Sequence, residues 1–211
     1  MTACWYIPET LADPRDDYKE GSTPSSYEAL AALGVFYKKY KKEEISDDVD
    51  QFITPFLKHI HYQHYDVITI SIKEMGEEKF HALAEKHFEE HLHKDDEVRL
   101  ILDGEGFFDI RDYLHKENKW IRVYVTAGDA IVVPKGIYHR FITNQKKYIK
   151  TVRLFQTNPK WEAINVKEGD STEERKNYIQ SITAPLSTLC GPADLSSIHK
   201  DNNNNNNINI I

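Results

Sequence analysis

Between residues 98 and 155 the sequence changes repeatedly from short β-branched and aromatic runs to turns that contain glycine or proline. The runs cover residues 98–102, 106–110, 120–125, 130–133, 139–143 and 148–155. Gly104, Gly106, Gly128, Pro134 and Gly136 fall within or between them. Several short strands at this spacing, with no helical period between them, are typical of an all-β fold. The pattern therefore predicts an antiparallel sandwich or barrel.

Three segments before this region are predicted as regular structure. Ser25 and Glu28 form a capping-box pattern, which predicts a helix over about 26–40. The run 67–72 is mostly β-branched and predicts a strand. A second helix over 80–88 is predicted from residues spaced i, i+3, i+4, i+7 and i+8, namely Phe80, Leu83, Ala84, His87 and Phe88. We expect these amino-terminal helices to pack at one side of the barrel.

The composition excludes several classes of protein. The 211 residues carry 27 Lys and Arg against 34 Asp and Glu, a formal net charge of −7, which argues against a nucleic-acid binder. No run approaches the roughly 20 apolar residues that span a bilayer, and the first residues do not resemble a signal peptide. Cys4 and Cys190 lack metal-ligand spacing and are predicted as free thiols in a reducing compartment. We expect a soluble monomer in the cytoplasm, with the nucleus as a second location, and neither nucleic-acid nor membrane partners.

The carboxyl-terminal stretch differs in composition from the rest. Residues 181–200 mix proline, glycine and serine without a period, and residues 202–207 are all asparagine. Such polar segments cannot bury enough apolar surface to offset the entropy lost on ordering. We therefore predict one folded domain over 1–180 and a low-complexity, disordered tail over 181–211.

Four of the residues most suited to ligating a metal occur in two blocks. His91, His93 and Glu97 form an HxHxxxE motif, and His139 follows the turn at Pro134. On a strand, residues at even separations share a face, so the first three, together with Arg99, are expected to project into a barrel interior. Three imidazoles and a carboxylate suit Fe(II), Ni(II), Mn(II) or Zn(II) and leave two octahedral positions open. A substrate could chelate the ion through those positions.

The two blocks resemble the two motifs of the cupin superfamily, a single double-stranded β-helix (jelly-roll) barrel with flanking α-helices. Glu97 is followed by Gly104, and Gly128 is followed by a PxGxxH sequence that ends at His139. The block 89–112 further resembles that of the acireductone dioxygenase family, as does the block 134–141. Short sequences at 5–6, 13–15 and 33–35 match the same family, so that the resemblance covers roughly residues 1–180.

The resemblance implies a dioxygenase of the methionine salvage pathway that acts with O2 on the acireductone 1,2-dihydroxy-3-keto-5-methylthiopentene. It implies one Fe(II) or Ni(II) per monomer. With Fe(II) such enzymes yield formate and 4-methylthio-2-oxobutanoate. With Ni(II) they can yield methylthiopropionate, formate and carbon monoxide.

Three further residues are assigned to the expected site. Arg99 shares the face of Glu97 and is the candidate catalytic residue that stabilises the substrate anion, with a salt bridge inside the barrel as the alternative. Phe108 and Phe141 are candidate substrate-binding residues that wall the pocket, a role compatible with core packing. The family often carries phenylalanine at the position of His87, so this wall is expected to be more polar here.

Other interpretations stay open at this stage. A different cupin oxygenase or isomerase, or a cupin that binds without turnover, would carry the same ligands, because a fold and a metal do not define a function. His59, His61 and His64 form a weaker HxHxxH pattern with no carboxylate to complete a site. The basic run 38–42 is typical of a solvated surface.

Overall fold

The computed structural model describes residues 4–19, 23–41, 48–49, 53, 62–115, 119–156 and 162–184. The strands within these residues are β1 (Cys4–Ile7), β2 (Phe36–Lys39), β3 (His64–Ser71), β4 (His91–Leu92), β5 (Glu97–Arg111), β6 (Trp120–Thr126), β7 (Asp129–Val133), β8 (His139–Thr143), β9 (Tyr148–Phe155) and β10 (Ile164–Asn165). The helices are α1 (Tyr27–Ala32), α3 (Ile72–Met75), α4 (Glu77–Phe88), α5 (Val166–Gly169) and α6 (Glu173–Thr183).

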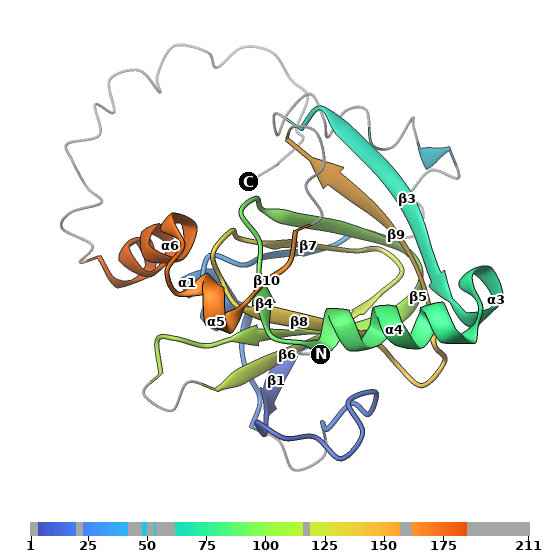
Figure 1. Cartoon of the computed structure of the whole chain (residues 1–211), viewed down its shortest axis with the longest axis horizontal. Coiled ribbons are helices and arrows are strands. Elements are labelled where there is room, and N and C mark those ends of the chain that lie inside the picture. The colour runs from blue at the N-terminus through green and yellow to red at the C-terminus, as the bar shows by residue number, and fades with distance from the viewer. Residues whose placement is uncertain are drawn as a thin grey trace.

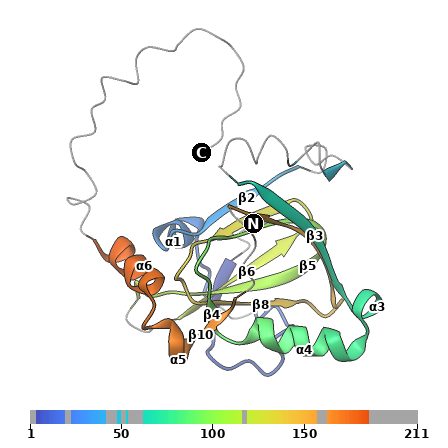
Figure 2. The same ribbon diagram turned by 45° about the horizontal axis from the view of Figure 1, so that its top comes forward.

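All strand pairs in the described residues are antiparallel, and they form two sheets that share β5. In sheet A the order is β1-β6-β5-β8-β4-β10. In sheet B it is β2-β7-β5-β9-β3. The sheets curve around one interior, with the helices outside (Figures 1 and 2). This arrangement confirms the predicted single cupin barrel with flanking helices.

Strand β5 corrects the sequence-based prediction of two separate strands at 98–102 and 106–110. It is one strand that leaves sheet B and enters sheet A, and its pairing with β9 shifts register between Ile101 and Asp103. Gly104 lies at this bend with φ +79°, a conformation that favours glycine. A Cβ there would lie 2.4 Å from the carbonyl oxygen of Tyr148. Glycine thus allows one strand to serve both sheets, a feature that residue patterns alone do not distinguish from a turn.

The barrel core is built from the alternation of side chains along the strands. In β7, Asp129, Ile131 and Val133 are buried, whereas Ala130 and Val132 are only partly buried. Ile121, Val123 and Val125 of β6 belong to the same buried cluster as Ile131 and Val133. Each such side chain contributes about 1.5–3 kcal/mol when it is fully buried. This core holds the strands that carry the site described below.

The first predicted helix is much shorter than expected. Helix α1 ends at Ala32, and the chain continues as strand β2 rather than as helix to residue 40. Gly34, at φ +77°, follows the helix, and the backbone N–H groups of Leu33 and Val35 both bond to the carbonyl of Leu30. Glycine after a helix commonly ends it in this way. The aromatic strand formers that follow then pair with β7.

The cap of α1 also differs from the prediction. Ser26, not Ser25, accepts the hydrogen bond from the backbone N–H of Ala29, at 3.1 Å. Ser25 is buried, and its own N–H donates to the carbonyl of Cys4 in β1. Because Ser25 is tied to the sheet, the next residue forms the cap.

The second predicted helix is confirmed as α4, which packs against β8. The two amino-terminal helices do not lie at one side, however. Helix α1 lies beside α6, whereas α4 lies on a different part of the barrel (Figures 1 and 2). The reason is topological, because α1 precedes a strand of sheet B and α4 precedes the short β4 of sheet A.

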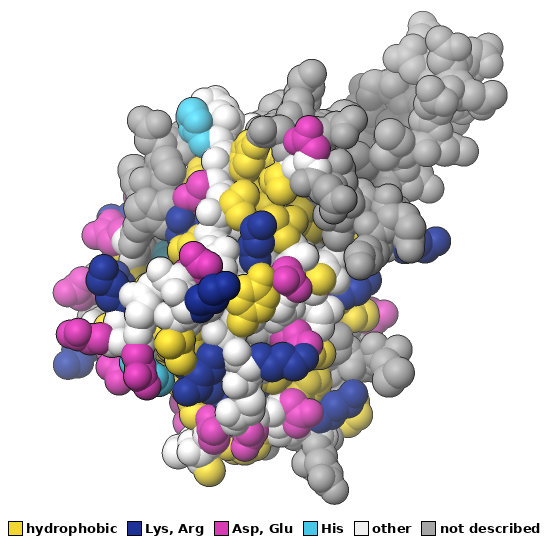
Figure 3. Space-filling view, turned by 90° about the vertical axis from the view of Figure 1, so that its right-hand side faces the viewer, with side chains coloured by type: hydrophobic (Ala, Val, Ile, Leu, Met, Phe, Trp, Pro, Cys, Tyr) yellow, Lys and Arg dark blue, Asp and Glu magenta, His cyan; other side chains and the backbone are white. Residues whose placement is uncertain are grey.

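The predicted domain boundary at 180 falls inside α6, which extends to Thr183. Residues 185–211 of the predicted tail, with Cys190, lie outside the described residues. In the part of the chain that the structure describes, none of the helices is both long and apolar enough to cross a membrane. Lysine and arginine side chains are interspersed with acidic ones on the face shown in Figure 3.

Candidate metal centre

His91, His93, Glu97 and His139 meet inside the barrel. One potential ligand atom from each lies within 4.8 Å of every other. His91 on β4 pairs directly with His139 on β8, and their ring centroids are 4.6 Å apart. The structure therefore brings together the four residues that the sequence analysis proposed as ligands, across 48 residues of chain.

The expected strand parity over 91–99 is wrong in detail. Strand β4 ends at Leu92, and β5 begins only at Glu97, so a turn separates His93 from Glu97. Two hydrogen bonds from the block 134–141 hold this turn in place. The N–H of Gly136 donates to the carbonyl of His93, and the N–H of Lys135 donates to Asp96. The ligands converge because one motif is hydrogen-bonded to the other, which a single-strand argument does not capture.

Backbone carbonyls orient all three imidazoles. Each ring places its Nδ1 at a carbonyl oxygen, which only accepts hydrogen bonds, so Nδ1 carries the proton and Nε2 is directed into the site. The three pairs are His91 with Glu89 at 2.7 Å, His93 with Glu162 at 2.8 Å and His139 with Ile137 at 3.2 Å. Sequence reasoning did not find these carbonyls, since any residue type can supply one.

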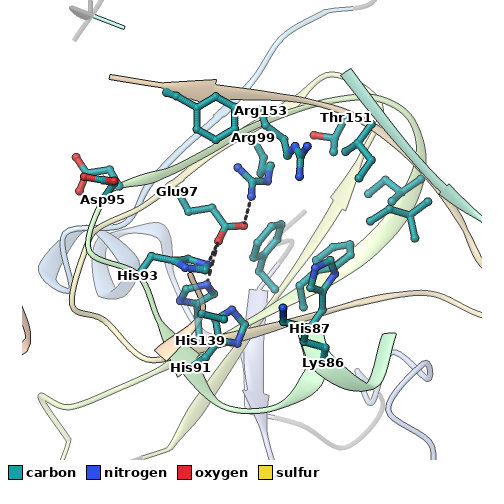
Figure 4. A pocket seen from close by; sticks show the side chains of 18 of the residues that line it. Lys86, His87, His91, His93, Asp95, Glu97, Arg99, His139, Thr151 and Arg153 are labelled. Carbon is teal, nitrogen blue, oxygen red and sulfur yellow. Dashed lines mark hydrogen bonds and ion pairs between the residues drawn. The ribbon is translucent and has the colours of Figure 1, made fainter. Parts of the chain in front are cut away.

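Glu97 lies at the centre of the charges in the site. Its Oε2 is 3.0 Å from Nε2 of His93 and 3.1 Å from Nε2 of His139, and its Oε1 is 3.2 Å from Nη2 of Arg99 (Figure 4). Burial alone would raise the pKa of Glu97, but Arg99 and the two imidazoles hold it well below its ordinary value. The carboxylate is therefore anionic and suited to a cation.

The histidines respond differently to their surroundings. Burial, reinforced by His139, lowers the pKa of His91 to about 3, so its imidazole is neutral near pH 7. Burial also disfavours the charged form of His93, but the adjacent carboxylate of Glu97 outweighs it and raises the pKa. A cation and a proton would compete for the Nε2 atom of His93.

A cavity of about 250 Å³ opens on these ligands. Its walls are largely apolar, and its volume is below the range of roughly 300–1,000 Å³ that is usual for drug-sized ligands, so it suits a small metabolite. Phe108 and Phe141 both line it, as the sequence analysis expected. They are cross-strand partners on β5 and β8, with ring centroids 4.8 Å apart. His87, at the end of α4, also lines the cavity.

Arg99 faces the same cavity, and the structure adds a neighbour that the sequence analysis did not identify. Arg153 of β9 is the register partner of Arg99 and also lines the cavity. Asp66 of β3 is the register partner of Arg153 and receives its Nε and Nη2 at 2.8 and 2.7 Å. Arg99, Arg153 and Asp66 are neighbours because of the register of β9 with β5 and of β3 with β9. No local sequence signal could therefore reveal this arrangement.

The other histidine cluster proposed from the sequence does not join this site. His64 is exposed at the start of β3, and it is not part of the group of potential ligands. His59 and His61 lie outside the described residues.

Comparison with known proteins identifies the family. The family model described as "ARD/ARD' family" matches residues 7–163. A protein of Emericella nidulans named acireductone dioxygenase is 41% identical over 185 residues, which cover 87% of this chain and 97% of that protein. The chain belongs to the ARD/ARD' family. A Macaca mulatta relative of the same name is 39% identical over 85% of the chain and 97% of its own length.

Other members of the ARD/ARD' family are longer. The Leishmania infantum protein named acireductone dioxygenase is 50% identical over 92% of this chain, but the match covers 56% of that protein. The chain thus spans about half the length of the Leishmania relatives. A solved structure titled "Acireductone dioxygenase from Bacillus anthracis with cadmium ion in active center" has a TM-score of 0.58 and 22% identity. It covers 70% of this chain and 94% of its own and supports the same fold.

The donor set of this ARD/ARD' family member fits a divalent metal ion. It offers three oriented imidazole nitrogens and one anionic carboxylate within 4.8 Å of one another. Borderline-hard cations favour such ligands. The adjoining cavity leaves space beside the ligands for a small chelating molecule.

Proposed function

We propose that the protein is an acireductone dioxygenase that cleaves 1,2-dihydroxy-3-keto-5-methylthiopentene with O2 in the methionine salvage pathway. The products are 4-methylthio-2-oxobutanoate and formate. The observation that carries this proposal is a four-residue metal site at the base of a small, mainly apolar cavity that also contains Arg99. The names of the relatives point to the same substrate and reaction.

His91, His93, Glu97 and His139 would hold one Fe(II) or Ni(II) ion per chain. When bound, the ion would act as a Lewis acid toward the enediol oxygens of the substrate. The carbonyls behind each imidazole fix the three rings before the ion arrives, so little rearrangement accompanies binding. With Ni(II), the same protein would give methylthiopropionate, formate and carbon monoxide.

Arg99 is proposed as the residue that stabilises the substrate's negative charge. Its guanidinium lines the cavity and already pairs with Glu97 at 3.2 Å. Burial lowers the pKa of Arg99, but from so high a starting value that the group stays cationic. A fixed cation that needs no reorganisation stabilises an anion efficiently in a site of low polarity.

The apolar walls are proposed to hold the methylthio end of the substrate. Phe108 and Phe141 present two packed rings to the cavity, and Ile68, Ile70 and Leu83 line it as well. Such walls exclude water, which strengthens the interactions of Arg99 with an anionic ligand.

Metal reconstitution tests the proposal. The metal-free protein is loaded with Fe(II) or with Ni(II), supplied with the acireductone and O2, and its products are identified by mass spectrometry. We expect the keto acid with Fe(II) and carbon monoxide with Ni(II). Binding of the acireductone without oxygen consumption under both metals would contradict the proposal and favour a binding protein.

The monomeric state and the cytoplasmic and nuclear locations remain predictions from the sequence. Light scattering on the metal-loaded chain tests the first, and fluorescence microscopy of the tagged protein tests the second.

A further inference from the structure

The segment 162–178, which includes β10, α5 and the first part of α6, lies against the strands and turns that carry the proposed ligands. Strand β10 pairs with β4, so that Asn165 is the register partner of His91. The carbonyl of Glu162 engages the ring of His93. Helix α5 lies beside β4, and α6 follows it in the chain (Figures 1 and 2). This segment therefore contacts the first motif of the metal centre directly.

Arg175 of α6 contacts the second motif, the block 134–141. It is only 6% exposed, and its Nη1 donates to the carbonyl of Gly136 at 3.1 Å. Its guanidinium lies over the rings of Tyr113 and Tyr138, at 3.9 and 4.5 Å from their centroids. The hydrogen bond and the two rings together hold Arg175 in one place beside this block.

The burial of Arg175 needs an explanation beyond packing. A buried cation is costly unless it is paired and hydrogen-bonded. The carboxylate that pairs with it, on Asp170, is 3.8 Å away and 70% exposed, so this ion pair contributes little. The faces of the tyrosine rings and the carbonyl of Gly136 stabilise the cation instead. Since an apolar side chain could fill the same space at lower cost, the guanidinium indicates a need for its bond to Gly136.

Gly136 connects Arg175 to two of the proposed ligands. Its N–H donates to the carbonyl of His93 at 3.0 Å, and its own carbonyl accepts from Arg175. The next carbonyl along the chain, that of Ile137, engages Nδ1 of His139. The two peptide groups that flank Gly136 are therefore both held, one by His93 and the other by Arg175.

Helix α6 also packs directly on the backbone of this turn. Gly136 has φ +80°, and a Cβ there would lie 2.4 Å from the carbonyl oxygen of Glu174 and 2.9 Å from the Cβ of Tyr178. Only glycine allows so close an approach, but glycine also gives the backbone many alternative conformations. A hydrogen bond at its carbonyl is a means of selecting one of them.

We propose that Arg175 is a positioning residue of the metal centre, which holds the turn at Gly136 in the conformation that directs His93 and His139 toward the ion. This inference rests on the proposed function. Arg175 acts through the backbone of the turn and not as a ligand. Its loss would leave all four ligands in the chain but would lower their affinity for a divalent ion.

Two substitutions at Arg175 and one control test the proposal. Arg175→Met removes the charge and the hydrogen bond but keeps a long side chain among the tyrosine rings. Arg175→Lys keeps the charge but replaces the planar guanidinium with an ammonium group, which cannot reproduce the stacked geometry. Tyr178→Phe is the matched control. Tyr178 is buried in the same helix, and its hydroxyl donates to the carbonyl of Leu33 at 2.9 Å, outside both motifs.

The assay separates metal affinity from stability. Each metal-free protein is kept at a temperature at which circular dichroism shows it to be folded, and its dissociation constant for Ni(II) is determined by competition with a chromogenic chelator. The visible spectrum of the Co(II)-loaded protein reports the geometry of the ligands. We expect Arg175→Met to weaken Ni(II) binding by about tenfold, Arg175→Lys to weaken it less, and both to alter the Co(II) spectrum. Tyr178→Phe should lower the melting temperature but match the wild type in Ni(II) affinity and Co(II) spectrum.

Several results would overturn the role of Arg175. Wild-type Ni(II) affinity in folded Arg175→Met would do so, as would wild-type affinity in Arg175→Lys if the methionine variant does not fold. Failure of both variants to fold would make Arg175 a core residue. An equal loss of affinity in Tyr178→Phe would assign the effect to the packing of α6.

The proposed function is tested separately with the wild type. If the wild type binds Ni(II) but does not oxidise the acireductone, the proposed function fails while the affinities still decide the role of Arg175. If the wild type binds neither Ni(II) nor Co(II), the proposed metal site itself is wrong.

Discussion

His91 and His139 are direct cross-strand partners, with imidazole centroids 4.6 Å apart. Strand β4, which carries His91, is only two residues long and is held between β8 and β10. The distance between these two ligands therefore depends on the register of sheet A. Anything that shifts β8 against β4 would separate the ligands without altering any of them.

Loss of one ligand should release the metal. In Glu97→Ala or His139→Ala the remaining three donors cannot complete the site, so we expect metal content by elemental analysis to fall well below one ion per chain. His64→Ala, which removes an exposed histidine outside the cluster, is the control and should keep full metal. Stoichiometric metal in either ligand variant would contradict the assignment.

Metal should also stabilise the folded protein. An ion present at a hundredfold excess over its dissociation constant adds about 2.7 kcal/mol to the free energy of unfolding, provided it binds the native state alone. We expect Ni(II) to raise the melting temperature of the metal-free wild type. The same addition to His139→Ala should have little effect, and an equal rise there would place the ion elsewhere.

Gly104→Ala should destabilise the barrel. Its Cβ would lie 2.4 Å from the carbonyl oxygen of Tyr148 in a backbone conformation of φ +79°. Gly34→Ala is the matched control: its φ is +77°, but the nearest atom, in Pro134, would be at an ordinary 3.5 Å. In the control, the free energy of unfolding should fall by about 1–2 kcal/mol because of the backbone conformation alone. Urea unfolding should show a larger decrease in the free energy of unfolding for Gly104→Ala. Equal decreases in the two variants would contradict the role assigned to the bend.

Asp109→Asn should be among the most destabilising polar substitutions. Asp109 is 1% exposed and pairs with Arg122 at 2.7 Å and with Arg140 at 2.9 Å, both of which are also buried. Removal of its charge leaves two buried cations uncompensated, at a cost of about 3–5 kcal/mol. Lys146→Ala breaks a pair with Glu105 in which the lysine is 69% exposed, so it should cost no more than about 1 kcal/mol. Denaturant unfolding of the two variants compares them directly.

Arg99 should matter more to turnover than to metal content. At saturating metal, Arg99→Leu is expected to keep the ion but to lose on the order of 10²-fold in rate, by analogy with the loss of one oxyanion donor. Arg99→Lys tests whether charge alone suffices. Because Arg99 also contacts Glu97, metal affinity is measured in parallel. Unchanged oxygen consumption in folded, metal-loaded Arg99→Leu would leave Arg99 a packing residue.

Local sequence patterns were sufficient for much of the fold. The runs at 139–143 and 148–155 coincide with β8 and β9, and the helical period at 80–88 lies within α4. The four candidate metal ligands could also be predicted, because they lie in two sequence motifs of fixed spacing. These features depend on side-chain periodicity and on turn-forming residues, both of which can be read from a few neighbouring residues.

Only the tertiary structure decided the rest. It joined two predicted strands into β5, ended α1 at Ala32 and placed Arg153 beside Arg99. It also supplied the carbonyl that orients each imidazole. The physical reason is that strand register and backbone hydrogen bonds are made between segments far apart in the chain, and any residue can take part in them. The sequence alone therefore determined which side chains could bind a metal, whereas the pairing of distant strands determined where those side chains point and what surrounds them.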